Sequence, residues 1–162
     1  MQKNNSPFSL LINLLLIIQG ISSFAQDSSF NSYTSINKIT VGRLISDRVT
    51  SSFVNPSVVL EKDFNSINFT PGIKYKGVVP NNIVTKKLLL KFNIRNATDT
   101  INSIYFFPGF YYTNIQLFRL NGTSLVKIPN ILPDNSDSIG YRLITLNPFD
   151  SATIIAELSF LK

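Results

Sequence analysis

Short runs of β-branched and aromatic residues, separated by clusters of Asn, Asp, Gly, Pro and Ser, extend from Ile36 to the end of the chain. The clearest run covers residues 87–96, where apolar and polar side chains alternate: Leu88, Leu90, Phe92 and Ile94 against Lys91, Asn93 and Arg95. A period of two places one set of side chains in a core and the other in water. Many short strands at this spacing predict an all-β sandwich or barrel.

The same reasoning predicts the other strands and turns. Further strands are predicted at residues 101–107 (returning from the first), 112–120 with Ile115 and Leu117 on one face, 125–128, 140–146 and 152–161. Turns are predicted at Asn96–Asp99, Pro108-Gly109, Asn121-Gly122 and Asn147–Asp150. Weaker strand candidates cover residues 39–45, 57–60 and 67–70, and residues 26–35, 78–82 and 129–138 are predicted to be loops.

Residues 1–25 have the pattern of a secretory signal peptide. Lys3 supplies the positive charge, an apolar stretch follows, and Ser23-Phe24-Ala25 predicts cleavage after Ala25. The apolar run is shorter than the ~20 residues of a membrane-spanning helix, so an uncleaved anchor is the less favoured alternative. We therefore expect an exported protein of the periplasm or cell surface, divided into a signal peptide (1–25), a polar leader with a first weak strand (26–48) and a β-sandwich domain (49–162).

The absence of two residue types excludes several kinds of catalytic and metal-binding site. The chain has no Cys and no His, which excludes disulfides, thiolate nucleophiles, imidazole bases and zinc sites built from these ligands. A glycosidase needs two carboxylates about 5–9.5 Å apart, and the 9 acidic residues include no identifiable pair. Asp134 and Asp137 offer oxygen ligands for calcium, but without EF-hand spacing a turn is favoured. We expect a binding domain, not an enzyme, with no metal and no cofactor.

The net charge of +6 does not by itself indicate a nucleic-acid partner. The Lys and Arg residues are scattered along the chain and form no basic run, so a solvated surface is the expected role of these charges. Export also separates the protein from nucleic acid, which we do not expect as a partner.

Several segments resemble one known family. Residues 87–99, Lys-Leu-Leu-Leu-Lys-Phe-Asn-Ile-Arg-Asn-Ala-Thr-Asp, are similar to a strand and turn of the extracellular sensor domain in receptors with seven membrane spans and diverse intracellular signalling modules. Residues 104–119 are similar to its next two strands, and residues 140–148 with the final strand are similar to its closing segment. The leader ending in Phe24-Ala25-Gln26 resembles leaders of the Bacteroidetes group.

The resemblance implies a periplasmic jelly-roll sandwich, similar in architecture to carbohydrate-binding modules. Such a domain would sense a ligand and signal through membrane spans beyond this chain to a kinase or cyclase. The chain would then be the N-terminal sensor of a two-component histidine kinase, although without His it is not itself the phosphorylated kinase. The alternative is a free-standing secreted β-sandwich protein of the cell envelope, with a structural or adhesive role.

The predicted ligand site combines aromatic and basic residues and would take a small molecule or a glycan. Sugars stack their C–H faces on exposed rings, and residues 105–112 contain six aromatic side chains. Tyr111 and Tyr112 follow the Pro108-Gly109 break, so at least one should be exposed. Substituting both with Ala is predicted to abolish binding without unfolding, and binding is expected to shift the final strand, 152–161.

The polar part of the predicted site consists of Arg119, Tyr141 and Arg142. Arginine binds carboxylates through two parallel hydrogen bonds, which would suit an acidic sugar or peptide. Each of these candidate residues could instead have a purely structural role, because aromatic rings commonly fill cores and arginines commonly lie along sheet surfaces.

Overall fold

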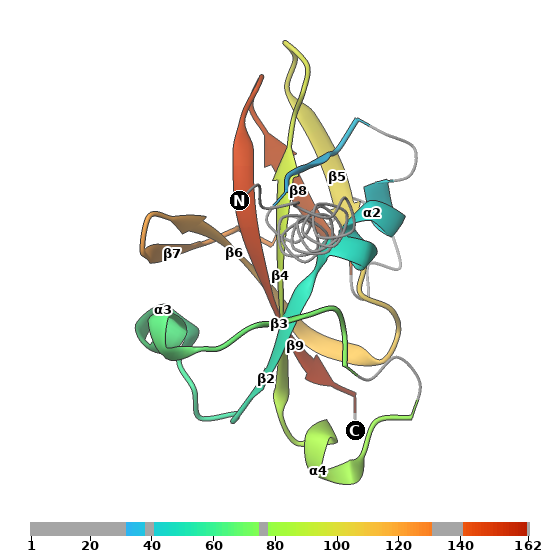
Figure 1. Ribbon diagram of the computed structural model, residues 1–162, viewed down its shortest axis with the longest axis vertical. Helices are drawn as coiled ribbons and strands as arrows, with labels where there is room; N and C mark the ends of the chain where they lie inside the picture. The colour runs from blue at the N-terminus through green and yellow to red at the C-terminus, as the bar shows by residue number, and fades with distance from the viewer. Residues whose placement is uncertain (1–31, 38–40, 75–77, 131–140, 162) are drawn as a thin grey trace, which may run out of the picture. The chain divides into compact units, whose positions relative to one another are not determined.

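The computed structural model describes residues 32–37, 41–74, 78–130 and 141–161 (Figure 1). The chain divides into a unit of residues 1–32 and a unit of residues 33–162, and every described helix and strand belongs to the second. The predicted signal peptide, its cleavage site at Ala25, and Asp134 and Asp137 of the predicted loop lie outside the described residues.

Strands are the main regular elements of the described structure. The strands are β1 (Thr34–Ser35), β2 (Thr50–Val54), β3 (Thr70–Pro71), β4 (Lys87–Arg95), β5 (Asn102–Phe106), β6 (Tyr112–Asn121), β7 (Ser124–Lys127), β8 (Arg142–Leu146) and β9 (Ser151–Phe160). The helices are α2 (Val41–Arg48), α3 (Leu60–Asp63) and α4 (Asn81–Val84), and a 3₁₀ turn follows α3 at Phe64–Ser66. Among the described residues, no helix is both long and apolar enough to cross a membrane.

These strands form two sheets. The larger has the order β3-β2-β4-β9-β6-β7, with β1 added in parallel to β4, and the smaller consists of β5 and β8. Every strand pair except β1–β4 is antiparallel. The predicted all-β class is therefore confirmed as a mostly antiparallel β-structure, and two facing sheets are consistent with a sandwich.

The main core lies between the two sheets. The alternating side chains of β4 predicted to face inward, Leu88, Leu90, Phe92 and Ile94, are all buried, at most 7% exposed. They pack with Ile144 and Leu146 of β8 and with Ile104 and Phe106 of β5. Phe92 and Phe106 stack across the two sheets, with ring centroids 5.6 Å apart and planes at 13°.

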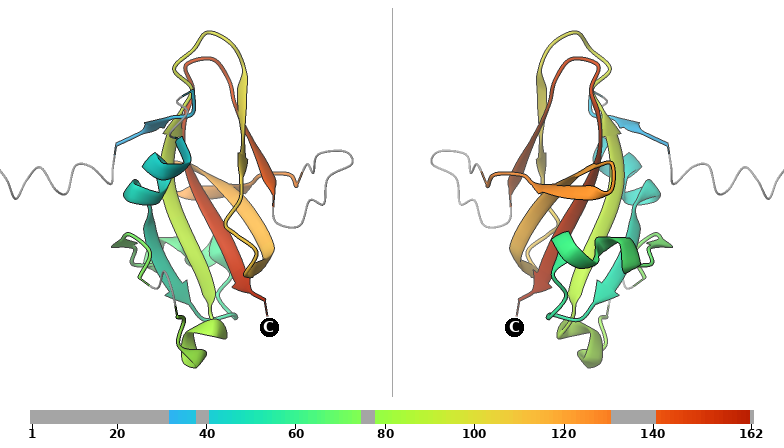
Figure 2. Two further views of the ribbon diagram at one scale, coloured as in Figure 1. Left: turned by 90° about the vertical axis from the view of Figure 1, so that its right-hand side faces the viewer. Right: turned by 90° about the vertical axis from the view of Figure 1, so that its left-hand side faces the viewer.

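The strand pairs are nested along the chain. β4 pairs with β9, β5 with β8, and β6 with β7, so the chain folds as one long antiparallel ribbon. The ribbon turns back at the predicted Asn121-Gly122 turn, where Gly122 has a φ of 61° that suits glycine. The β4–β5 and β8–β9 connections both cross between the sheets, and they lie side by side at one end (Figure 2).

The outer face of the larger sheet is partly covered, contrary to the expectation that it faces water. Leu89, Phe118 and Ile155 form a second buried cluster there with Leu60 of α3. The carboxylate of Asp63 accepts a hydrogen bond from the Val59 N–H at 2.9 Å, which supports the first turn of α3. The strand predicted at residues 57–60 is therefore wrong, because this segment turns into a helix that covers the sheet.

Five other predictions for local structure need correction. The strand predicted at residues 39–45 is wrong for residues 41–45, because they lie in α2, and the apolar residues of this stretch also fit helical spacing; residues 39 and 40 lie outside the described residues. Only Thr70 of the predicted strand 67–70 lies in a strand, and α4 begins inside the predicted loop 78–82. The strand after the first turn does form as β5, but it pairs with β8 and does not return along β4. Thr34 and Ser35, expected in a loose leader, are buried beside β4.

Candidate functional site

Four aromatic side chains gather on the outer side of the smaller sheet and on the segment that follows β5. We call Tyr105, Phe107, Phe110 and Tyr141 the aromatic patch. The Phe107 and Tyr141 rings stack at 4.6 Å with planes at 13°. Tyr105 meets Tyr141 edge-on at 6.4 Å, and Phe110 meets Phe107 edge-on at 5.0 Å. The four rings therefore form one connected surface.

Strand alternation explains why these rings face outward. Ile104 and Phe106 pack into the core, so Tyr105 between them points away from it. Beyond β5, Gly109 has a φ of 109°, a backbone conformation that suits glycine, and the chain turns there toward Phe110. Phe110 is 75% exposed, Tyr105 56% and Tyr141 37%. The patch thus presents large apolar faces to solvent.

Polar groups and a cavity border the patch. Ser103 and Thr145 lie opposite each other on β5 and β8, and their hydroxyls are 2.8 Å apart. A cavity of about 320 Å³ opens beside Tyr105 and Phe107, and most of its lining is apolar: Ile45, Val49, Ile73, Leu90, Phe92, Ile104, Phe106 and Pro108, with Ser46. This combination of ring faces, hydroxyls and an apolar recess is typical of small-ligand sites.

The predicted residues Tyr111 and Tyr112 have different environments. Tyr111 is 79% exposed, so the expectation that at least one of the two is exposed is confirmed. Tyr112 packs against the main core and against Phe160, with ring centroids 5.2 Å apart. Burial raises the pKa of Tyr112 above its usual value. Tyr112 therefore helps to hold the start of β6 in place.

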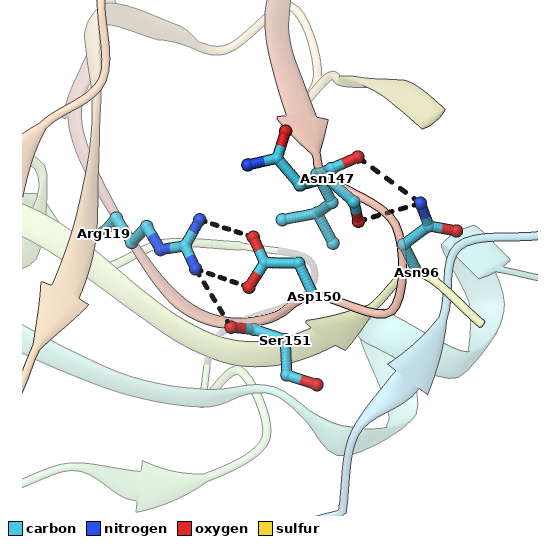
Figure 3. A network of polar contacts seen from close by, with 6 residues as sticks. Asn96, Arg119, Asn147, Asp150 and Ser151 are labelled. Carbon is cyan, nitrogen blue, oxygen red and sulfur yellow. Dashed lines mark hydrogen bonds and ion pairs between the residues drawn. The ribbon is translucent and has the colours of Figure 1, made fainter. Parts of the chain in front are cut away.

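Arg119 is bound within the fold. Its two terminal nitrogens donate to the carboxylate oxygens of Asp150 at 2.9 and 2.8 Å, and one also donates to the Ser151 carbonyl at 3.1 Å (Figure 3). The hydrogen bond from Arg119 lowers the pKa of Asp150, and the same bond raises the pKa of Arg119. Arg119 lies about 20 Å along β6 from Tyr112, so the structure does not bring it to the predicted tyrosines.

Arg142 directly follows Tyr141 of the patch, yet its side chain forms a hydrogen bond to the backbone of β6. Pairing between β6 and β9 is irregular between Thr113 and Gln116. There, Arg142 Nε donates to the Ile115 carbonyl at 2.8 Å, and Nη1 donates to the Tyr141 carbonyl at 2.7 Å. Burial lowers the pKa of Arg142 from its ordinary value. Arg142 thus supplies a hydrogen-bond donor to β6 where the backbone pairing of β6 with β9 is interrupted.

The structure places only one of the five predicted residues, Tyr141, in the aromatic patch. The other members of the patch belong to the aromatic run noted in the sequence: Tyr105, Phe107 and Phe110. The sequence does not reveal that pairing of β5 with β8 places Tyr141, which directly precedes β8, beside them. Strand alternation could single out Tyr105, whereas Phe110 depends on the turn at Gly109. In the described part of the chain, no group of three or more acidic residues could hold a metal ion.

Comparison with known proteins identifies no relative. No protein-family model matches this sequence, and neither curated proteins nor solved structures give a match. The functional interpretation therefore depends on the geometry of the described residues.

Proposed function

We propose that this chain is an exported, non-catalytic domain that binds a small glycan on its aromatic patch and acts as the sensor of a membrane receptor. The observation that carries the proposal is the connected patch itself, in which three of the four rings are more than a third exposed. An unbroken aromatic surface of this kind offers stacking faces for a sugar ring, and Ser103 and Thr145 offer hydroxyls beside it.

A jelly-roll fold, as in carbohydrate-binding modules, is the finer architecture that we propose. A jelly roll arises when a long antiparallel ribbon wraps into two sheets. The nested pairs β4–β9, β5–β8 and β6–β7 support this proposal, as do the β4–β5 and β8–β9 connections, which both cross between the sheets.

The proposed output of the sensor is β9. Phe110 of the patch precedes Tyr111, whose carbonyl accepts a hydrogen bond from the Leu161 N–H at 2.9 Å, directly after β9. A ligand that moves the Phe110 segment would therefore act on the end of β9. Signalling requires that the ligand bind one receptor state better than the other.

The test is a titration of the purified chain with neutral oligosaccharides, followed by tyrosine fluorescence, since the chain has 6 Tyr and no Trp. Tyr105→Ala and Tyr141→Ala should each weaken binding about tenfold, because each removes a stacking face. Tyr33→Ala is the matched control, since Tyr33 is 45% exposed and lies outside the patch. Equal affinities for all three variants, or no binding by the wild type, would contradict the proposal and favour the adhesive alternative.

A further inference from the structure

A second concave site lies between the segment that leads into α3 and the strands of the larger sheet. This polar cleft has a volume of about 580 Å³, within the roughly 300–1,000 Å³ of small-molecule sites. It is lined by residues of four regions of the fold: Pro56 to Glu61, Lys87 with Glu157, Asn114 to Gln116 with Phe118, and Lys127 with Asn130 and Arg142. None of these residues belongs to the aromatic patch.

Two hydrogen bonds fix the guanidinium of Arg142 in this cleft and use two of its three nitrogens. Nε and Nη1 donate to the carbonyls of Ile115 and Tyr141. Nη2 has no partner among the described residues, and the side chain is only half-buried. Two backbone bonds thus orient a charged donor without neutralising it, because carbonyl groups carry no formal charge.

The charges that line the cleft leave an excess of cations. Lys87 and Glu157 form an ion pair at 3.2 Å, and Lys87 also donates to the Val58 carbonyl at 3.0 Å. Their charges cancel locally, which among the described lining residues leaves Lys127 and Arg142 against the carboxylate of Glu61. An anionic group entering the cleft would therefore meet two cations.

The backbone at the cleft is shaped by a bulge. Asn114 has a φ of 50°, in the left-handed region that glycine adopts most readily and that asparagine adopts more often than most other residues. It lies in the irregular stretch between Thr113 and Gln116, and bulges of this kind often redirect side chains beside functional sites. The amides of Asn114 and Asn130 add hydrogen-bonding groups that suit sugar hydroxyls. The amide nitrogen of Gln116 donates to the backbone carbonyls of Leu117 and Ile128, so only its oxygen adds to them.

We propose that the polar cleft binds the carboxylate of an acidic sugar, with Arg142 and Lys127 as its cationic contacts. A carboxylate matches the fixed donor of Arg142, and the surrounding amides match the hydroxyls of a sugar ring. The proposal does not rest on glycan binding at the aromatic patch, because the two sites share no residue.

The experiment is calorimetric titration of the purified chain with glucuronate, glucose and inorganic phosphate. Glucuronate should bind about tenfold or more tightly than glucose, the size expected for a charge-assisted hydrogen bond. Added salt should weaken its binding. Lys127→Gln and Arg142→Gln should each reduce glucuronate affinity by a similar factor. Circular dichroism of both variants shows whether each is folded.

The matched control is Lys86→Gln, which removes the same charge from an exposed lysine outside the cleft and should leave the affinity unchanged. Lys127 is exposed, and its side chain takes no part in strand pairing. Lys127→Gln therefore remains informative even if Arg142→Gln unfolds. Tyr105→Ala should leave glucuronate binding intact, which separates this site from the patch. The proposal is overturned if glucose or phosphate binds as tightly as glucuronate, or if Lys127→Gln behaves like Lys86→Gln.

Discussion

The side-chain amide of Asn96 donates a hydrogen bond to the backbone carbonyl of Asn147 at 3.0 Å (Figure 3). Asn96 follows β4 and Asn147 follows β8, so this bond joins the β4–β5 and β8–β9 connections, each of which crosses between the sheets. The same amide donates to the Thr100 carbonyl at 2.6 Å, and Oδ1 accepts from the Thr98 N–H at 3.1 Å. Asn96 is 1% exposed, so water cannot readily replace these bonds.

We expect Asn96→Ala to lower the free energy of unfolding by about 2–4 kcal/mol, because it leaves buried carbonyls without a donor. Asn96→Asp should also destabilise, since a carboxylate keeps the acceptor and loses the donor. Urea denaturation measures both. Asn82→Ala, at an exposed position of α4, is the control and should change stability by no more than about 0.5 kcal/mol. A loss for Asn96→Ala no greater than this control would refute the role of Asn96.

The Arg119–Asp150 pair should make stability depend on pH in the acid range. An unfolded Asp titrates near pH ~3.9, and the hydrogen bond from Arg119 lowers the pKa of Asp150 in the folded state. Below about pH 4–5 the unfolded chain therefore takes up a proton that the folded chain does not. The contribution of the pair is fully present above this range and is lost as the pH falls through the folded-state pKa.

Urea denaturation between pH 7 and pH 2 measures this effect. At pH 7, Asp150→Asn should cost about 1 kcal/mol, a modest value because the two side chains keep 32% and 21% of their surface exposed and solvent screens the pair. Below pH 4 the variant should lose less stability than the wild type does. Asp99→Asn, at an exposed turn position, is the control at pH 7 and should change stability by no more than about 0.5 kcal/mol.

Long strands with strict alternation could be predicted from the sequence, because side-chain period alone defines them. The runs that became β4, β6 and β9 were located within about two residues, and Ile115 and Leu117 share the buried face as expected. Which strands pair with each other could not be predicted in the same way. The sequence indicates a turn after β4, but only tertiary packing sends β5 to the other sheet.

Short elements and the site depended on contacts that the sequence does not display. Residues 57–60 carry β-branched residues, yet Leu60 begins α3 and is buried against Leu89 and Phe118 of the larger sheet. Arg119 matched the pattern of a ligand-binding arginine, but its carboxylate partner is Asp150, 31 residues away in the sequence. Long-range pairing of this kind decides whether a charged side chain is available for a ligand.

Thr34 tests whether β1 belongs to the folded unit. It is 1% exposed, and its hydroxyl has no hydrogen-bond partner among the described residues. Thr34→Val should therefore raise the free energy of unfolding by about 1 kcal/mol, because it replaces an unsatisfied polar group with a methyl of similar size. Thr153→Val is the matched control and should destabilise, since it removes a 2.8 Å bond to Asn93. No gain for Thr34→Val would mean that β1 is not docked in solution.

Tyr111 and Tyr112 are adjacent, and we expect their substitutions to separate binding from stability. Tyr112→Ala should lower the free energy of unfolding by about 2–3 kcal/mol, because the ring packs on Phe160 and the main core. Tyr111→Ala should change it by no more than about 0.5 kcal/mol, since that side chain is 79% exposed. Tyr112→Phe keeps the ring and should restore most of the loss. Thermal and urea unfolding of the three variants measure these differences, and similar stabilities for Tyr111→Ala and Tyr112→Ala would show that Tyr112 is not part of the core. A variant at Tyr112 therefore cannot report on ligand binding until its folding is established, whereas Tyr111→Ala can be titrated directly.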